Sequence, residues 1–368
     1  MLYKYIEMKE LNLLCLKLEC KENNILDNII LYETVDIDVL DKLINSSLLL
    51  TYTSKTQSVL GFKYEYESEK QQLQAYRNLI TPEGFAKVTY KKSDIRYGRS
   101  NPVKSLSQFS IRRQIRHTLS RYEYVDVDIN NCHPTILYQI MKANNIECKC
   151  LESYVENREY WFDLIKNAYD LKNNINVIKD HNMLKDLCKL LFIRLLYGGS
   201  LHQWKVDSDI NIDCKTPVEL TKFIREVEVH SQTIADHNPN LYKLVKDKKI
   251  KSKIIDEDGY YIQKDKVKNK KKTKFNINGS VTSYFLQEVE IRILELMFIY
   301  SAENSYITQN NCVLCADGLM IPIKNYKPSI LLELSKIVEE KTQLKLTFSK
   351  KAMDQDYLQI LDKNLTYN

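Results

Sequence analysis

The stretch of sequence that decides the fold is YVDVDINNCHP, residues 124–134. Apolar and acidic side chains alternate before it turns polar, which predicts a strand from Tyr122 to Ile129 with its apolar residues on one face. Asp126 and Asp128 fall on the other face, and a helix is expected to begin at His133-Pro134, because Pro is well placed in a first turn. The stretch therefore predicts a rigid strand that ends in a carboxylate just before a helix.

A carboxylate at a strand end is a rigid ligand for a hard cation such as Mg²⁺, which prefers oxygen ligands. The ordinary alternatives are that Asp126 and Asp128 cap the following helix or lie on a solvated face. A second carboxylate, Asp317, interrupts the apolar segment 312–323, which predicts two short strands joined tightly at Asp317-Gly318. Asp-Gly is also an ordinary hairpin turn, but two such carboxylates on separate strands could clamp two metal ions about 4 Å apart.

A strong amphipathic helix is predicted from Met183 to Leu196, ended by Gly198-Gly199. Four residues recur along it at every fourth position and share one face, namely Lys185, Lys189, Ile193 and Tyr197. Two cations and an aromatic ring on one stripe suit a nucleoside triphosphate, with ammonium groups on the phosphates and the ring beside the base. A solvated Lys edge with a core Tyr is the simpler alternative.

Composition and charge narrow the class of protein. The chain has 368 residues, of which 44% are hydrophobic and 28% charged, a globular composition. The net charge of +6 is concentrated in two stretches: 91–116 holds eight Lys and Arg against Asp94 alone, and 264–274 holds seven Lys against Asp265 alone. Such clusters favour a nucleic-acid backbone as partner, although the second could be a solvated loop.

No apolar run approaches a membrane span of about 20 residues. Nine Cys without regular spacing favour a reducing, intracellular compartment.

The remaining elements are assigned from periodicity. Helices are expected at 281–300 and 329–342, a last strand at 344–348, and an exposed Lys-rich hairpin or loop at 243–274. Cys312 and Cys315 have zinc-like spacing, but no second pair lies nearby in sequence and the segment has the pattern of a strand. His117, within the first basic stretch, is interpreted as a surface or backbone contact.

Taken together, these blocks resemble the motifs of superfamily A polymerases, which include family A DNA polymerases and single-subunit phage-type RNA polymerases. The order and spacing carry the resemblance over roughly residues 95–355. Segment 98–116 is similar to a shortened first motif, 128–134 to motif A and 316–318 to motif C. The motif B spacing, R-x-x-x-K-x-x-x-(F)-x-x-x-Y-G, is matched by Lys185, Lys189, Tyr197 and Gly198.

The resemblance implies a role for each matched residue. Asp128 and Asp317 would bind two Mg²⁺ or Mn²⁺ ions. Lys189 would hold the triphosphate and assist the departing pyrophosphate, and Lys185 would hold the outer phosphates. Tyr197 would stack near the nascent pair, with Gly198 allowing close backbone approach. The basic residues of the first motif would contact the template–primer, Arg99 in the minor groove at the primer end, and they are Arg99, Arg112 and Arg116.

Three residues of this chain differ from the motifs of these polymerases. Lys185 replaces an Arg, so bidentate grip is lost, and Ile193 replaces an aromatic residue. His133 takes the position of a Glu that helps exclude ribonucleotides, so deoxyribonucleotide and ribonucleotide substrates both stay open.

The motifs N-C-H-P at 131–134 and A-D-G at 316–318 resemble those of the divergent branch found in transposons, virophages and related viruses. That branch is often linked to a superfamily 3 helicase, and this chain has no G-x-x-x-x-G-K-[ST] loop, which makes a separate replicative helicase an expected partner.

The resemblance implies an α/β (α+β) right hand with an antiparallel palm sheet. Residues 1–90 would form an N-terminal lobe or reduced thumb, without a proofreading exonuclease, and 91–368 the palm and fingers, with fingers at about 135–280. The expected activity is template-directed addition of nucleotides to a primer 3′-hydroxyl, in replication of a virus or mobile element. The expected location is the host cytoplasm or a viral replication site. A primase or terminal transferase of the same fold, and an inactive nucleic-acid-binding replication subunit, are the alternatives.

Overall fold

The structure is a computed structural model that describes residues 11–18, 24–52, 66–93, 95–171, 181–251, 260–261, 273–274 and 276–359. The chain divides into two compact units. The first consists of Met1–Leu11, Lys21–Asn130 and Glu290–Asn368, and the second of Asn12–Cys20 and Asn131–Val289. The long segment of the second unit is similar in extent to the predicted fingers, whereas the assignment of a separate lobe at 1–90 and of fingers stays a prediction.

The first unit contains two antiparallel sheets. The first sheet has the order β1-β2-β3 and the second β7-β8-β4-β9. Their strands are β1 (Ile30–Thr34), β2 (Phe85–Lys92), β3 (Ser100–Pro102), β4 (Tyr124–Ile129), β7 (Val313–Cys315), β8 (Gly318–Pro322) and β9 (Phe348–Lys351). The helices are α1 (Ile37–Ile44), α3 (Glu69–Arg77), α4 (Arg113–Ser120), α13 (Ile330–Thr342) and the part of α12 (Ile277–Glu303) that begins at Glu290. Three short 3₁₀ turns accompany them, namely η1 (Val103–Ser105), η2 (Gln108–Ser110) and η3 (Ile323–Asn325). An α/β fold with an antiparallel sheet is thus confirmed.

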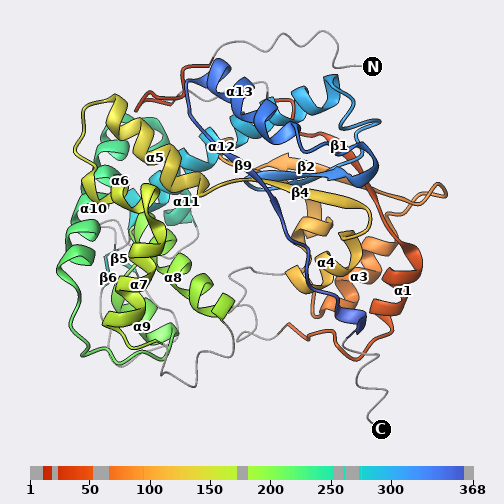
Figure 1. Cartoon of the computed structure of the whole chain (residues 1–368), viewed down its shortest axis with the longest axis horizontal. Helices are drawn as coiled ribbons and strands as arrows, with labels where there is room; N and C mark the ends of the chain where they lie inside the picture. The colour runs from red at the N-terminus through yellow and green to blue at the C-terminus, as the bar shows by residue number, and fades with distance from the viewer. Residues whose placement is uncertain are drawn as a thin grey trace. The chain divides into compact units, whose positions relative to one another are not determined.

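Both faces of the second sheet are covered. Figure 1 shows α13 on one side of β4 and β9, and α1, α3 and α4 on the other. All six residues of β4 are consequently buried, Asp126 and Asp128 among them. The alternative that Asp126 and Asp128 lie on a solvated face is therefore wrong. Helix α5 (Cys132–Ala143) has Asn131 at its N-cap position, without a side-chain hydrogen bond, so neither carboxylate caps it.

Tyr124 fixes the beginning of β4. Its hydroxyl accepts a hydrogen bond from the backbone N–H of Thr34, at 2.5 Å, and donates one to Asn311 Oδ1, also at 2.5 Å. Thr34 ends β1, and Asn311 lies just before β7. A buried, fully paired hydroxyl of this kind fixes the position of the strand that carries the two carboxylates.

A buried carboxylate organises the core beneath β1. Glu33 is fully buried and accepts hydrogen bonds from the hydroxyls of Tyr76 (2.6 Å), Tyr90 (3.1 Å) and Ser107 (2.6 Å) and from the Gln108 N–H (2.9 Å). Burial raises the pKa of Glu33 even though these donors act in the opposite direction. The network links β1, α3, β2 and η2, and it satisfies the polar groups that these elements bury.

The two short strands at 312–323 form the predicted hairpin, but the turn lies one residue earlier than expected. Cys315 pairs with Gly318, which leaves Ala316 and Asp317 as the turn residues and places Gly318 in β8. Ala316 has φ of 54°, a left-handed conformation that costs roughly 1 kcal/mol for a residue with a Cβ. Backbone strain of this kind is often found at functional sites.

The second unit is mainly helical. Its elements are α5, α6 (Lys149–Glu156), α7 (Arg158–Ala168), α8 (His181–Leu196), α9 (Leu201–Asp207), α10 (Val218–His237), α11 (Pro239–Lys251), β5 (Tyr260–Tyr261), β6 (Thr273–Lys274) and the first part of α12 (Ile277–Glu303). Aromatic side chains from α6, α7, α8 and α10 pack together in its core, with Tyr154 and Phe192 ring centroids 4.4 Å apart and Phe192 and Phe223 5.2 Å apart. This packing holds one face of α8 in place.

Most helix predictions are confirmed, and two segments need correction. The helices at 183–196, 281–300 and 329–342 correspond to α8, α12 and α13. The supposed hairpin or loop at 243–274 begins instead with the last turns of α11, and β5 and β6 pair antiparallel beyond it. The last strand begins at Phe348 rather than Leu344. Leu344 and Leu346 are buried without ladder pairing, so their alternation reflects burial and not strand structure.

Candidate active site

The register of β4 and β8 brings Asp128 and Asp317 together. Asp128 is the partner of Gly318, and the N–H of Ile129 donates a hydrogen bond of 3.1 Å to the Asp317 carbonyl. Asp317 therefore lies in the hairpin turn, beside the end of β4 that carries Asp128. Asp128 on β4 and Asp317 in the turn between β7 and β8 are thus neighbours at one end of the sheet.

The surroundings of Asp126 and Asp128 favour the protonated forms of their carboxyl groups. Burial, and then the nearby charge of Asp317, raise the pKa of Asp128 well above its ordinary value. Burial also raises the pKa of Asp126, although Lys351 and Arg116 act in the opposite direction. Desolvated like charges at such proximity repel each other unless a cation or a proton is present.

The carboxylate oxygens fit divalent cations. Among the described residues, Asp126 Oδ1 and Asp128 Oδ1 are buried without a hydrogen-bond partner. Hard cations such as Mg²⁺ take oxygen ligands, and orphaned carboxylate oxygens beside a second carboxylate are suitable donors. The site can therefore hold a divalent ion through Asp128 and Asp317, with Asp126 behind them.

Lys351 was not singled out from the sequence, yet it is paired with Asp128 at this site. It is the register partner of Asp126 on β9, and its ammonium forms an ion pair with Asp128 Oδ2. The charges of Asp128, Asp317 and Asp126 all raise the pKa of Lys351, which burial alone would lower. Only the antiparallel pairing of β4 and β9 brings this Lys to the site, so sequence spacing carried no signal for it.

The second unit gathers the residues of the predicted motif B. Lys185, Lys189 and Tyr197 lie on one face of α8 and just beyond it, and all three are at least partly exposed. The opposite face packs into the aromatic core through Phe192. Lys185 forms an ion pair of 2.8 Å with Glu159, whose side chain is itself half-exposed. The structure thus supports a solvent-facing Lys stripe on a rigid helix, and the triphosphate role stays a prediction.

Tyr197 is held from two sides. Its hydroxyl is hydrogen-bonded to His133 Nδ1, and the two rings meet edge to face with centroids 5.8 Å apart. Asn276 Nδ2 donates to the carbonyls of Tyr197 (3.0 Å) and Gly198 (2.6 Å). Gly198 has φ of 65°, and a Cβ at this position would meet the Asn276 side chain at 2.2 Å. Gly198 therefore allows the predicted close approach, and the approaching group within the described chain is Asn276, which sequence analysis did not identify.

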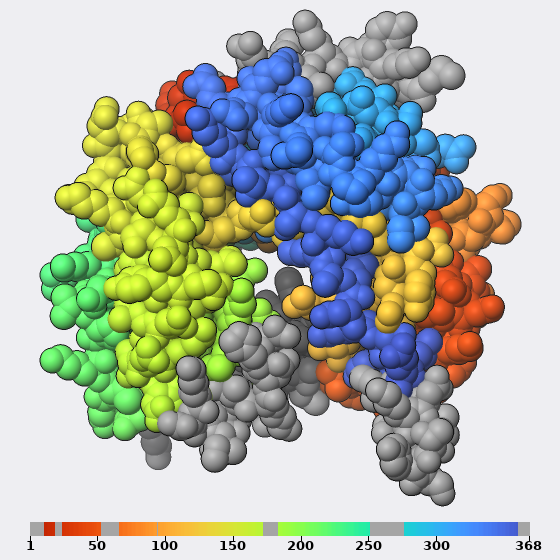
Figure 2. All heavy atoms as spheres, in the orientation of Figure 1, coloured from red at the N-terminus to blue at the C-terminus, as the bar shows by residue number. Residues whose placement is uncertain are grey.

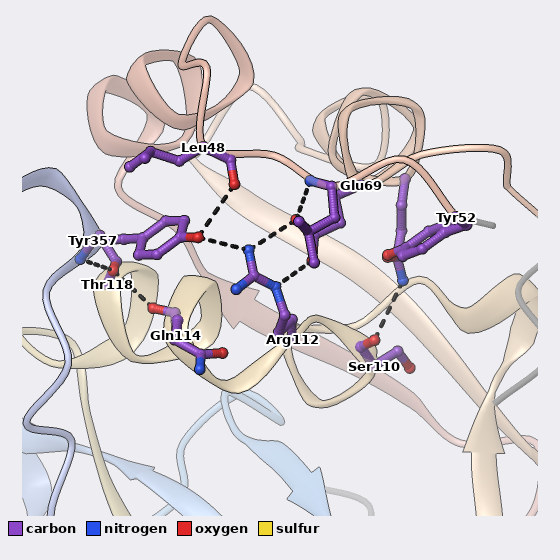
Figure 3. Close-up of polar contacts among 10 residues, drawn as sticks. Leu48, Tyr52, Glu69, Ser110, Arg112, Gln114, Thr118 and Tyr357 are labelled. Carbon is purple, nitrogen blue, oxygen red and sulfur yellow. Dashed lines mark hydrogen bonds and ion pairs between the residues drawn. The ribbon is translucent and has the colours of Figure 1, made fainter. Parts of the chain in front are cut away.

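Two of the three Arg residues predicted to contact nucleic acid are bound within the protein. Arg99 forms bidentate hydrogen bonds of 2.5 and 2.7 Å with the buried carboxylate of Glu290. Arg112 makes the same kind of pair with Glu69 at 2.5 and 2.9 Å, and a further bond of 3.0 Å with the Tyr357 hydroxyl (Figure 3). Their contact with a substrate stays a prediction, and each would have to leave a buried carboxylate to make it.

Arg116 and His117 both lie on α4. Arg116 donates to the Phe109 carbonyl at 3.2 Å and acts electrostatically on Asp126. His117 is buried, which corrects its interpretation as a surface contact. The Lys264–Lys274 run lies outside the described residues apart from Thr273 and Lys274. Cys312 and Cys315 are buried in the core, and burial raises the pKa values of both thiols.

Comparison with known proteins places this chain near two others. No protein-family model matches it. It is 29% identical over 277 residues to a Sputnik virophage protein named "Putative helicase V13", an alignment that covers 74% of this chain and 30% of that protein. The chain thus spans under a third of the length of this relative. Among solved structures it is similar to the POL domain of Pol1 from M. smegmatis, in complex with DNA primer-template and dNTP, with a TM-score of 0.42, 13% identity, and coverage of 78% of this chain and 51% of that one. No helix in the described part of the chain is long and apolar enough to cross a membrane.

Proposed function

We propose that this chain is a template-directed nucleic-acid polymerase that adds nucleotides to a primer 3′-hydroxyl. The observation that carries the proposal is the position of Asp128, on β4, beside Asp317, in the turn between β7 and β8. Phosphoryl transfer by a two-metal mechanism needs carboxylates fixed on two sides of a metal pair about 4 Å wide. A covered sheet with an acidic end supplies such fixed positions, because strands hold side chains more rigidly than loops do.

Asp128 and Asp317 would hold the two ions, Mg²⁺ or Mn²⁺. When bound, such a pair supplies a lowered pKa at the attacking hydroxyl and neutralises charge on the triphosphate and leaving group. The chain's own contribution is to fix the carboxylates before substrate arrives. Tyr124 positions the beginning of β4, and Gly318 leaves space for the Asp128 side chain.

The α8 face would bind the nucleoside triphosphate. Lys189 is exposed on this face and would act on the phosphates as pyrophosphate departs. Lys185 would hold the outer phosphates once its ammonium exchanges Glu159 for substrate. An exposed ion pair costs little to break, since such pairs contribute about 0–1 kcal/mol. The exchange is therefore energetically easy.

Sugar selection would fall to the pair of His133 and Tyr197. Their hydrogen bond fixes the phenol ring at the end of α8. His133 can donate or accept at Nδ1 depending on its tautomer, whereas a carboxylate could only accept. The pair therefore leaves both deoxyribonucleotides and ribonucleotides as candidate substrates.

A helicase is the proposed partner, and replication of a virus or mobile element, within an intracellular and reducing compartment, is the proposed setting. The virophage relative supports this proposal through its name and its greater length. Template–primer DNA or RNA would be the common substrate of both activities.

A primer-extension assay tests the proposed function. Purified protein is incubated with a labelled primer on a longer template, with deoxyribonucleotides or ribonucleotides, in Mg²⁺ or Mn²⁺. We expect extension that copies the template sequence. Templated synthesis without any primer would indicate a primase, and untemplated addition to the primer would indicate a terminal transferase. No incorporation with any combination would contradict the polymerase proposal.

A further inference from the structure

The ammonium of Lys351 lies at the proposed metal site, beside Asp128. Its ammonium is paired with Asp128 Oδ2, and its charge also acts on Asp126 and Asp317. The Lys351 side chain is 44% exposed, whereas that of Asp128 is 5% exposed. The Lys can therefore move into solvent, while the carboxylate is fixed in the strand.

The segment that carries Lys351 lies at the surface of the first unit. Figure 2 shows the C-terminal segment on the outside, next to the residues of α4. Tyr357 N–H donates to Thr118 Oγ1 of α4 at 2.8 Å, and Arg121 pairs with Asp356 at 2.9 Å. These bonds fasten the chain beyond β9, so the backbone at Lys351 stays in place even if its side chain leaves Asp128.

Charge balance distinguishes the metal-free and metal-bound states. Without metal, the ammonium of Lys351 is paired with Asp128, its charge also acts on Asp126 and Asp317, and that of Arg116 acts on Asp126. A pair of divalent ions would more than neutralise the three carboxylates, and the ammonium would then be repelled from Asp128. Lys351 and a metal ion also compete for the same carboxylate, because each is held by the negative charge of Asp128.

We propose that Lys351 is an internal counter-ion that holds Asp128 in the metal-free protein and is released when a divalent ion binds. This inference rests on the two-metal site proposed above. Lys351 is thus a positioning residue: it keeps the carboxylates folded against each other without metal and raises the metal concentration at which the site fills.

Metal binding by a Lys351→Met variant tests the proposal directly. Free Mn²⁺ is measured by electron paramagnetic resonance during titration of wild-type and variant protein, without nucleic acid. Removing the competing ammonium should tighten Mn²⁺ binding on the order of tenfold. In EDTA the variant should be less stable to heat than wild type, and Mn²⁺ should raise its Tm by more than it raises that of wild type.

Lys350→Met is the matched control. Lys350 is the neighbour of Lys351 on β9, it pairs in register with Val127, and its ammonium lies 5.8 Å from the Tyr326 ring centroid. It carries the same charge on the opposite face of the strand. Its removal should leave Mn²⁺ affinity unchanged, which separates a local effect from the net charge of the protein.

A second measurement needs no variant, and it tests the release of Lys351 from Asp128 even if Lys351→Met does not fold. Wild-type protein is acylated at its amines under limiting conditions, with and without Mg²⁺, and each Lys is quantified by mass spectrometry. Release from Asp128 should increase labelling of Lys351 several-fold in Mg²⁺, while labelling of Lys350 stays constant.

The outcomes separate this inference from the proposed function. Equal Mn²⁺ affinity in wild type and Lys351→Met, or labelling of Lys351 that does not respond to Mg²⁺ in a protein that binds it, would overturn the release of Lys351 alone. If neither protein binds Mn²⁺, the two-metal site fails and the release of Lys351 fails with it.

Discussion

Gly318 on β8 is the register partner of Asp128 on β4, and the two residues are in such close contact that no side chain fits between them. A Cβ at position 318 would lie 2.3 Å from the Val127 carbonyl oxygen and 2.7 Å from Asp128 Oδ1. The Gly is therefore required by the backbone and the carboxylate opposite it and not by a turn conformation. The residue after Asp317 thus belongs to the proposed metal site.

Gly318→Ala tests this relationship. The new methyl group must displace either β4 or the Asp128 carboxylate, so we expect a loss of roughly 2 kcal/mol or more in the free energy of unfolding. Nucleotide incorporation should fall further than stability alone explains, which primer extension well below the Tm would measure. Gly84→Ala is the control: Gly84 has φ of 85°, and beyond its chain neighbours no atom lies within 4 Å of where the methyl carbon would stand, so only the backbone cost of roughly 1 kcal/mol applies. Equal effects of the two variants would contradict the argument.

Asp128→Asn and Asp317→Asn should each abolish incorporation. The amide keeps the shape of the side chain but removes the charge that holds a cation. Affinity for template–primer should stay near that of wild type, because the metals act mainly on the transition state. Fluorescence anisotropy would measure binding, and single-turnover extension the chemistry. Near-wild-type incorporation by either variant would rule out the two-metal assignment.

The sequence predicted the β4 strand, the β7–β8 hairpin and the helix α8 because each has a strong local period and a terminating signal. It could also place Asp128 on one strand and Asp317 within a separate hairpin, although Asp317 lies in the turn of that hairpin and not on a strand. It could not predict that β4 is covered on both faces, since the alternation of Val and Asp is the same pattern that a half-solvated strand shows.

Contacts between residues far apart in sequence were the second feature that the sequence alone could not predict. Arg99 and Arg112 form ion pairs with Glu290 and Glu69, which lie 191 and 43 residues away in sequence. A basic stretch of sequence shows the number of cations but not which of them are already paired. Lys351 was missed for the same reason, because its position at the site depends on the pairing of β9 with β4.

Lys189→Ala and Lys185→Ala should affect catalysis differently. Lys189→Ala should lower the maximal rate more than it weakens nucleotide binding, because its charge matters most as pyrophosphate leaves. Lys185→Ala should mainly raise the nucleotide KM, since outer-phosphate contacts are similar in the ground and transition states. Steady-state kinetics over a range of nucleotide concentrations separates the two. Small and equal effects would favour the interpretation of this face as a solvated Lys edge.

Substitutions of Arg112 and Arg113 should distinguish an Arg that stabilises the fold from an Arg that binds nucleic acid. Arg113 is exposed, so Arg113→Ser should weaken binding to template–primer and reduce the slope of log K against log salt by about one unit. Arg112→Ser should leave Glu69 buried without its counter-charge and destabilise the protein by roughly 3–5 kcal/mol. Salt titrations and urea unfolding of both variants measure these effects. A salt slope unaffected by Arg113→Ser would show that this exposed Arg does not contact the phosphate backbone.

Protonation of His117 on unfolding should lower the free energy of unfolding as the pH falls. Burial in the first place, and then the positive charges of Arg113 and Arg116, lower the pKa of His117 to about 4 from 6.5. Asp354, with Oδ1 3.7 Å from the ring Nδ1, acts in the opposite direction, and Arg121 lowers the pKa further.

The unfolded chain binds a proton at His117 near its ordinary pKa of about 6.5, whereas the folded chain binds it only near pH 4, so unfolding takes up a proton between these values. The contribution of His117 to stability is complete above pH 6.5 and is lost as the pH falls toward 4, by at most about 3 kcal/mol. His117→Gln cannot take up this proton, so urea unfolding from pH 4.5 to 7 should show a shallower decline in stability than wild type. His237→Gln, at an exposed position of α10, serves as the control and should follow the wild-type curve. A His117→Gln curve parallel to that of wild type across this window would show that His117 is not the group that titrates on unfolding.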